Sequence, residues 1–129
     1  MDYRGIVIEE SLVDAKVLQS LTIVNTAVES VTEGHRTPWL KRWTMHTVSV
    51  PEEKIRDVAA ELSQVLEGGH SWYADLKNDR YHFIVFHGKV FCVDRRNPDE
   101  YEKARQYGVS VGVPEHQLDF GPDTKEWER

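Results

Sequence analysis

The apolar residues between positions 55 and 66 recur with the period of an α-helix. They stand at i, i+3, i+4, i+7, i+10 and i+11, namely Ile55, Val58, Ala59, Leu62, Val65 and Leu66. This spacing puts all of them on one face of a helix. Pro51 suits the first helical position, the acidic pair Glu52 and Glu53 complements the helix dipole, and Gly68 and Gly69 end the helix. The pattern predicts an amphipathic helix that buries one face.

Segments rich in β-branched and aromatic residues lie on both sides of this helix, with turn residues between them. They predict strands over residues 3–10, 22–32, 43–50, 71–77, 80–86 and 89–94. Asn78-Asp79 and His87-Gly88 are typical two-residue turns, so the last three strands are predicted to form a β-meander.

Two further helices are indicated by capping residues. Ser11 followed by Asp14 resembles a helix cap, and a short helix to about Gln19 is predicted. Its apolar stripe consists of Leu12, Val13, Val17 and Leu18. Asn97 is a cap followed by Pro98 and Glu100, and this third helix is predicted to end at Gly108.

The order of these elements predicts an α+β fold. The first six, β-α-β-β-α-β, match the ferredoxin-like split βαβ arrangement, and a C-terminal β-meander extension and a third helix would follow. We expect two helices to cover one face of an antiparallel sheet. The length and the lack of an internal repeat or linker predict a single domain over residues 1–129.

The predicted turn at Asn78-Asp79 sets a register in which residue 77 faces 80, 75 faces 82 and 73 faces 84. One face of the meander then carries Trp72, Ala74, Leu76, Tyr81, Phe83, Val85, Val90 and Cys92, and we expect it to form the core. The other face carries Tyr73, Asp75, His82, Ile84, Phe86, Phe91 and Val93. Cys92 is therefore expected to be a buried hydrophobic residue rather than a nucleophile.

The second face of the meander is also largely apolar, whereas a sheet with one wet face alternates apolar and polar residues. We therefore expect something to cover it. The candidates are the third helix, the C-terminal segment with Val111, Val113, Leu118 and Phe120, a second subunit, or a ligand. A second subunit would make the protein a homodimer, and a ligand bound there would contact Tyr73.

The net charge, the cysteine count and the hydropathy of the chain exclude or disfavour several classes of protein. The net charge of -6 disfavours nucleic-acid binding, and the single cysteine excludes an internal disulfide. No apolar run is long enough for a membrane span and no signal-peptide pattern stands at the start. These features predict a cytoplasmic protein that does not bind membranes.

Asp75 and His82 are the best-placed acid and imidazole, because the predicted register sets them opposite each other. Such a pair can act as a general base, or it can be a cross-strand polar contact. The six histidines show no ligand spacing, and nucleotide and hydrolase motifs are absent. We therefore expect no metal and no cofactor. We expect a protein that binds a ligand or a partner rather than one that catalyses a reaction. A small enzyme that uses Asp75 and His82 as its general base is the alternative.

The segment GHRTPWLKRW, residues 34–43, gathers basic and aromatic side chains in an acidic protein. Arg36, Lys41 and Arg42 could hold a small anionic ligand while Trp39 stacks on it. Single-stranded nucleic acid would use the same residue types, which is a further alternative function. In the plainer interpretation Trp39 and Trp43 close the end of the core and the bases are solvated.

Two strings in the chain resemble a family of small prokaryotic proteins to which no activity is assigned. They are TPWLKRWT at 37–44 and SWYADLKNDRYHFIVF at 71–86. The resemblance implies an intracellular prokaryotic protein and carries over no catalytic residue. The sequence as a whole predicts a ligand- or partner-binding domain that acts as a homodimer.

Overall fold

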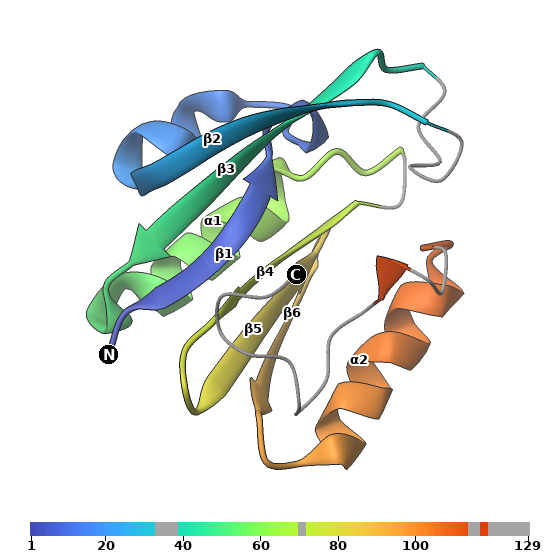
Figure 1. Ribbon diagram of the computed structural model, residues 1–129. Coiled ribbons are helices and arrows are strands. Elements are labelled where there is room, and N and C mark those ends of the chain that lie inside the picture. Colours follow the sequence, from blue (N-terminus) through green and yellow to red (C-terminus); the bar gives the residue numbers. More distant parts are fainter. Residues whose placement is uncertain (33–38, 70–71, 114–116, 119–129) are drawn as a thin grey trace.

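The computed structural model of the chain describes residues 1–32, 39–69, 72–113 and 117–118 (Figure 1). Its centre is a six-stranded sheet with the order β2-β3-β1-β4-β5-β6, in which all neighbouring strands are antiparallel. The strands are β1 (Tyr3–Ile8), β2 (Thr22–Ser30), β3 (Arg42–Val50), β4 (Tyr73–Lys77), β5 (Tyr81–Phe86) and β6 (Lys89–Asp94). The helices α1 (Ile55–Val65) and α2 (Pro98–Ser110) pack on this sheet.

The predicted α+β class is confirmed, whereas the ferredoxin-like topology is not, because the order of the six strands differs from it. The predicted first helix is also wrong in type. Its place is taken by two short 3-10 helices, η1 (Glu9–Ser11) and η2 (Ala15–Ser20). Asp14 caps η2 by accepting a hydrogen bond from the backbone N–H of Lys16 at 2.9 Å. Val13, predicted to lie on the buried stripe, is 67% exposed.

The predicted amphipathic helix is present as α1, preceded by the 3-10 turn η4 (Glu52–Lys54). Its apolar stripe and the buried residues of η2 pack on the same face of the sheet and form the first core. The members of this core include Val17, Leu18, Val48, Val50, Ile55, Val58, Leu62, Leu66, Trp72, Leu76, Phe83 and Val85. No helix in the described parts of the chain has the length and apolar character that crossing a bilayer requires.

The opposite face of β5 and β6 is covered by α2, which lies across the sheet from α1 (Figure 1). This second core consists of Ile84, Phe86, Val93, Tyr101, Ala104, Val113 and Leu118, with Tyr73, Phe91 and Tyr107 packed against it. The chain therefore covers its own second apolar face with the third helix and the segment after it, one of the predicted alternatives. Both face assignments of the meander are confirmed.

The third helix begins as predicted and ends later. The side chain of Asn97 accepts a hydrogen bond from the backbone N–H of Asp99 at 3.1 Å. Gly108 does not end the helix but lies inside it, where a Cβ would come within 2.7 Å of Leu118. The glycine that ends this helix is instead Gly112. Its φ of 94° is the left-handed backbone conformation that commonly follows a helix.

The predicted register of β4 and β5 is wrong by two residues. The side chain of Asn78 accepts hydrogen bonds from the backbone N–H groups of Arg80 (2.9 Å) and Tyr81 (2.8 Å), so the turn residues are 79 and 80 rather than 78 and 79. Asp75 consequently pairs with Ile84, and Lys77 pairs with His82. A shift of two residues keeps every side chain on its face, because side chains alternate with a period of two.

The prediction that Cys92 is buried is wrong, although its assigned face is right. Cys92 is exposed, because β6 is an edge strand. The pKa of its thiol is raised by desolvation, which disfavours the reactive thiolate.

Candidate functional site

Asp75, His82 and Tyr101 form a buried chain of hydrogen bonds between the sheet and α2. His82 Nε2 lies 2.5 Å from Asp75 Oδ2, and His82 Nδ1 lies 3.0 Å from the Tyr101 hydroxyl oxygen. The carboxylate can only accept, so Nε2 donates to it, and in the neutral ring Nδ1 accepts from the Tyr101 hydroxyl. Desolvation raises the pKa of Tyr101, which keeps its proton available for this bond.

This arrangement suits a structural role better than a general base. The side chain of His82 is fully buried and that of Asp75 is only 2% exposed. Both ring nitrogens of His82 are engaged within the protein, whereas a general base needs one nitrogen within reach of the substrate. The structure brings the two predicted residues together and places them beneath α2, where they join this helix to β4 and β5.

The basic and aromatic segment of residues 34–43 is only partly described, and Arg36 lies outside the described residues. Trp39 is 49% exposed, and Lys41 and Arg42 are exposed. Trp43 instead packs on Trp72 of the first core, with ring centroids 5.5 Å apart. Trp43 therefore closes the end of the core, and Trp39 does not.

The charge of Arg42 acts on a carboxylate of the same chain. Desolvation tends to raise the pKa of Glu10, but hydrogen bonds from Thr44 and the nearby positive charge of Arg42 lower it overall. The Thr44 backbone N–H and hydroxyl donate to the two carboxylate oxygens of Glu10 at 2.6 and 2.7 Å. Arg42, one of the cations of the predicted anion site, therefore already lies near the carboxylate of Glu10. The anion site itself stays a prediction.

Tyr73, the residue predicted to contact a ligand, packs against the second core. Its ring packs on Phe86 with centroids 5.7 Å apart, and its hydroxyl donates to the backbone carbonyl of Gln117. The side chain thereby ties the segment after α2 to β4.

Sequence reasoning missed a polar cluster on β3. The 3-10 helix η1 turns the side chain of Glu9 onto β3, where its Oε1 lies 3.0 Å from Nε2 of His46. The other ring nitrogen of His46 lies 2.8 Å from the Thr26 hydroxyl of β2. The alternation of residues 44–50 identifies the face of His46, but the sequence does not show that η1 folds back over it. His46 of β3 therefore contacts β2 through Thr26 and η1 through Glu9.

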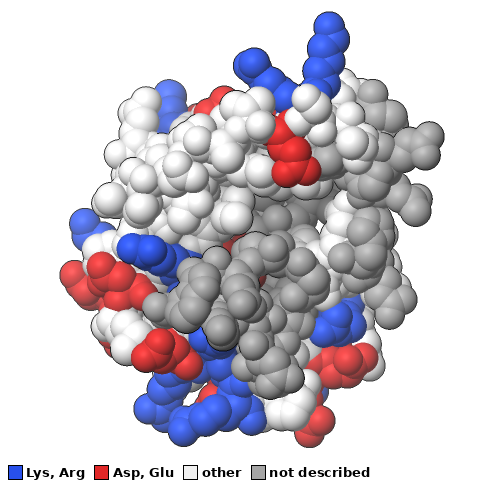
Figure 2. Space-filling view, in the orientation of Figure 1, with Lys and Arg blue, Asp and Glu red and all other residues white. Residues whose placement is uncertain are grey.

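The other side of β2 is an edge of the sheet. All nine of its residues are exposed, among them Ile23 (43%), Val24 (50%) and Val28 (62%). Figure 2 shows an area without charged side chains in the upper left of the molecule, where part of β2 lies, with blue and red side chains along its borders. β2 is therefore a long strand edge open to solvent, and Glu29 is its one charged residue.

Comparisons of the chain with protein-family models, with curated proteins and with solved structures found no match. The resemblance to the prokaryotic family therefore stays a prediction. Within the described ranges, no three His, Cys, Asp or Glu side chains are grouped closely enough to hold a metal ion.

Proposed function

We propose that this protein is a partner-binding domain whose β2 edge pairs with β2 of a second copy of the chain. The observation that carries the proposal is the exposure of all nine residues of a β-strand at the edge of the sheet. A strand edge presents unpaired backbone N–H and C=O groups, which is a template for pairing with another strand.

The β2 edge has few of the features by which proteins protect a strand edge from association. Such edges are usually short or carry Lys and Pro residues. β2 is longer than the usual strand of about five to six residues, and Glu29 is its only charged residue. A register irregularity between Ile23 and Asn25 disturbs one end and leaves the segment Asn25–Ser30 regularly paired with β3. This segment offers a continuous edge to a partner.

The chemistry of β2 suits a second copy. An antiparallel pair of identical strands has a two-fold axis, so each residue meets a residue of the same strand, in which Glu29 is the one charged side chain. The two copies of Glu29 stay apart unless the axis falls on Glu29 itself. A chain with a net charge of -6 repels its own copies, and a strand with one charge is a surface on which that repulsion is small.

The dimer proposed here does not use the second face of the meander, because α2 covers that face. Pairing through β2 would instead join two six-stranded sheets edge to edge. The closed two-fold pairing uses β2 of both copies and limits the assembly to a dimer.

We also propose that the first four strands form a ferredoxin-like unit to which β5 and β6 are added. The support is their antiparallel order β2-β3-β1-β4 and the packing of η2 and α1 in one core. Nuclear magnetic resonance tests it: helical chemical shifts over Ala15–Ser20 would strengthen this classification, and interstrand contacts in a different order would overturn it.

Sedimentation equilibrium tests the dimer. The chain has a mass of 15.0 kDa, so we expect a species of twice that mass. Val28→Lys puts a charge on the edge and should weaken self-association at least about tenfold. Val13→Lys is the matched control, because Val13 is equally exposed outside the sheet. A wild-type monomer at all concentrations, or equal effects of both variants, overturns the proposal.

A further inference from the structure

Glu9, His46 and Thr26 form a chain of hydrogen bonds that reaches the surface of the molecule. His46 Nε2 lies 3.0 Å from Glu9 Oε1, and His46 Nδ1 lies 2.8 Å from the Thr26 hydroxyl oxygen. The carboxylate can only accept, so Nε2 carries the proton, and Nδ1 of the neutral ring accepts from the hydroxyl. A carboxylate, an imidazole and a hydroxyl in this order are the arrangement of a catalytic triad.

The hydroxyl at the end of this chain is open to solvent, unlike the one in the buried network around His82. Thr26 is exposed, whereas Tyr101, which has the corresponding place beside His82, is 2% exposed. The side chain of His46 is 10% exposed and that of Glu9 is 47% exposed. A substrate can therefore reach Thr26 while the imidazole behind it stays largely shielded from water.

The three side chains are positioned by strand pairing and by η1. Pairing of β2 with β3 sets Thr26 directly opposite His46. Glu9 follows β1, where the 3-10 turn brings its carboxylate onto the imidazole. Glu10 of the same turn accepts hydrogen bonds from the backbone N–H and the hydroxyl of Thr44, which anchors η1 on β3. Ordered elements therefore hold the triad, as a catalytic site requires.

The strand register also gives the backbone N–H of Thr26 a direction. The N–H of Val31 donates to the carbonyl of Lys41, so these two residues form a hydrogen-bonded pair at the end of the β2–β3 ladder. Such pairs alternate with non-hydrogen-bonded pairs, whose N–H and C=O groups point away from the neighbouring strand. Thr26 stands an odd number of residues before Val31, so its N–H points to the open edge of the sheet. This N–H lies beside the hydroxyl and can donate to the oxyanion of an attacked ester.

We propose that Thr26 is the nucleophile of an acyl-transfer site that hydrolyses uncharged esters. Its Oγ1 bonds to the carbonyl carbon of the ester while His46 takes the hydroxyl proton at Nδ1. The bond from this carbon to the alcohol oxygen then breaks, and the leaving alkoxide takes the proton from Nδ1. Water attacks the acyl-threonine in the same way, which releases the acid and restores the hydroxyl. Glu9 is a positioning residue that holds the ring through Nε2 and stabilises the imidazolium.

The surface around Thr26 sets the class of ester. Ile23 and Val28 lie on the same face of β2 as Thr26, and both are exposed. A short apolar acyl group can lie on these side chains. The carboxylates of Glu9 and Glu10 are close by, and their charge disfavours an anionic substrate. The favoured substrate is therefore an uncharged ester with a short apolar acyl group.

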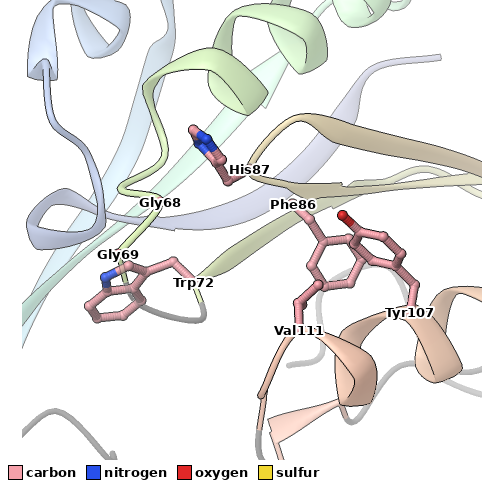
Figure 3. A pocket seen from close by; sticks show the side chains of 7 residues that line it. All are labelled: Gly68, Gly69, Trp72, Phe86, His87, Tyr107 and Val111. Carbon is pink, nitrogen blue, oxygen red and sulfur yellow. The ribbon is translucent and has the colours of Figure 1, made fainter.

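The triad lies apart from the pocket shown in Figure 3. That pocket has a volume of about 180 Å³ and opens between α2 and the loop after α1, and its lining residues include none of the triad. Trp72 points away from Phe86 and Tyr107 there, so the pocket has no slot between aromatic rings (Figure 3). The proposed substrate instead binds on the open face of β2.

The triad and the proposed dimer compete for the same strand edge. Pairing of β2 with a second copy would use the backbone N–H of Thr26, so the activity belongs to the monomer. The rate per chain is then expected to rise on dilution if the dimer forms. The triad itself does not require the dimer.

Hydrolysis of para-nitrophenyl butyrate, combined with mass spectrometry of the protein, tests the site. We expect a burst of para-nitrophenolate and a butyryl group that fragmentation locates on Thr26. Thr26→Val keeps the shape of the side chain and removes the hydroxyl, so it should lower the rate about a hundredfold, the lower end of what general-base catalysis contributes. Thr26→Ser restores a hydroxyl and should keep the activity. Both variants retain exposed imidazoles such as that of His87, whose slow reaction with esters is the background.

Two further variants separate catalysis from structure. Glu9→Gln keeps an acceptor for His46 Nε2 and removes the charge, so it should lower kcat and leave KM unchanged. Thr22→Val is the matched control, because Thr22 is an exposed threonine on the other face of β2, and it should hydrolyse the ester as the wild type does.

Two results overturn the proposal. One is an equal rate of hydrolysis for the wild type and Thr26→Val. The other is the absence of acylated Thr26 in the wild type at every protein concentration, which does not depend on the folding of a variant. A rate per chain that stays constant on dilution counts against the dimer and leaves the triad standing.

Discussion

His82 Nε2 lies 2.5 Å from Asp75 Oδ2, although the two residues are not directly opposite each other in the pairing of β4 with β5. Asp75 pairs with Ile84 and Lys77 pairs with His82, so the bonded residues are diagonal neighbours on one face. Diagonal neighbours lie about 7 to 8 Å apart at Cα, within reach of a long polar side chain. Through Tyr101, this diagonal contact joins β4, β5 and α2.

Removing the Asp75 carboxylate should destabilise the fold strongly. Asp75→Ala leaves the Nε2–H donor of the buried, neutral His82 without its acceptor, and a buried donor left unsatisfied costs about 1 to 3 kcal/mol. Urea denaturation measures the change in the free energy of unfolding. Asp79→Ala, an exposed acid in the same hairpin, should change it by less than about 0.5 kcal/mol. Similar values for the two variants would contradict the structural role of the network.

Acid should destabilise the protein partly through Glu10. Its folded pKa lies below the ordinary value of 4.5, so as the pH falls the unfolded state takes up the proton first. The stability from this group is therefore present above pH 4.5 and is lost as the pH falls through the folded pKa. Melting temperatures between pH 6 and 3 should fall less steeply for Glu10→Gln than for the wild type. The exposed Glu53→Gln control should keep the wild-type slope.

Trp39, which precedes β3, and Trp43, which lies in it, should differ in their contribution to stability. Trp43→Ala removes a ring that packs on Trp72 and should cost about 2 to 4 kcal/mol, somewhat less than a fully buried aromatic. Trp39→Ala, at a residue that is 49% exposed, should cost less than about 1 kcal/mol. Thermal unfolding followed by circular dichroism distinguishes them, and the reverse order would place Trp39 in the core.

Gly5 should tolerate no side chain. A Cβ at this position would collide with the backbone carbonyl of Asp75 on the neighbouring strand. β1 and β4 are paired through only Arg4, Gly5 and Ile6, and this pairing joins the two halves of the sheet. We expect Gly5→Ala to lower stability by more than about 3 kcal/mol, beyond the usual range for single substitutions. A variant with the wild-type melting temperature would show that the strands separate here without cost.

Self-association should also be visible in thermal stability. Because a dimer is stabilised by mass action, its melting temperature rises with protein concentration. Differential scanning fluorimetry over a hundredfold concentration range should show this rise for the wild type and not for Val28→Lys. A constant melting temperature in the wild type would argue against the dimer.

Local sequence patterns predicted the number and type of most strands and helices and the faces of the meander. The apolar stripe of α1 and the cap at Asn97 depend on local periodicity and local hydrogen bonding, which the sequence shows directly. The predicted face assignments survived a register error of two residues, because a strand repeats with the same period. The predicted face of Cys92 was right for this reason, while its burial was not.

Which segment covers each face of the sheet, and which side chains contact each other, depends on how the elements pack together. The preference of Asn78 for accepting backbone hydrogen bonds moved the turn, and the 3-10 form of η1 brought Glu9 to His46. The edge position of β2 depends on strand order, and the pocket depends on the approach of α2 to the loop after α1. These relationships join residues far apart in the chain. They depend on packing between elements, which local periodicity does not encode.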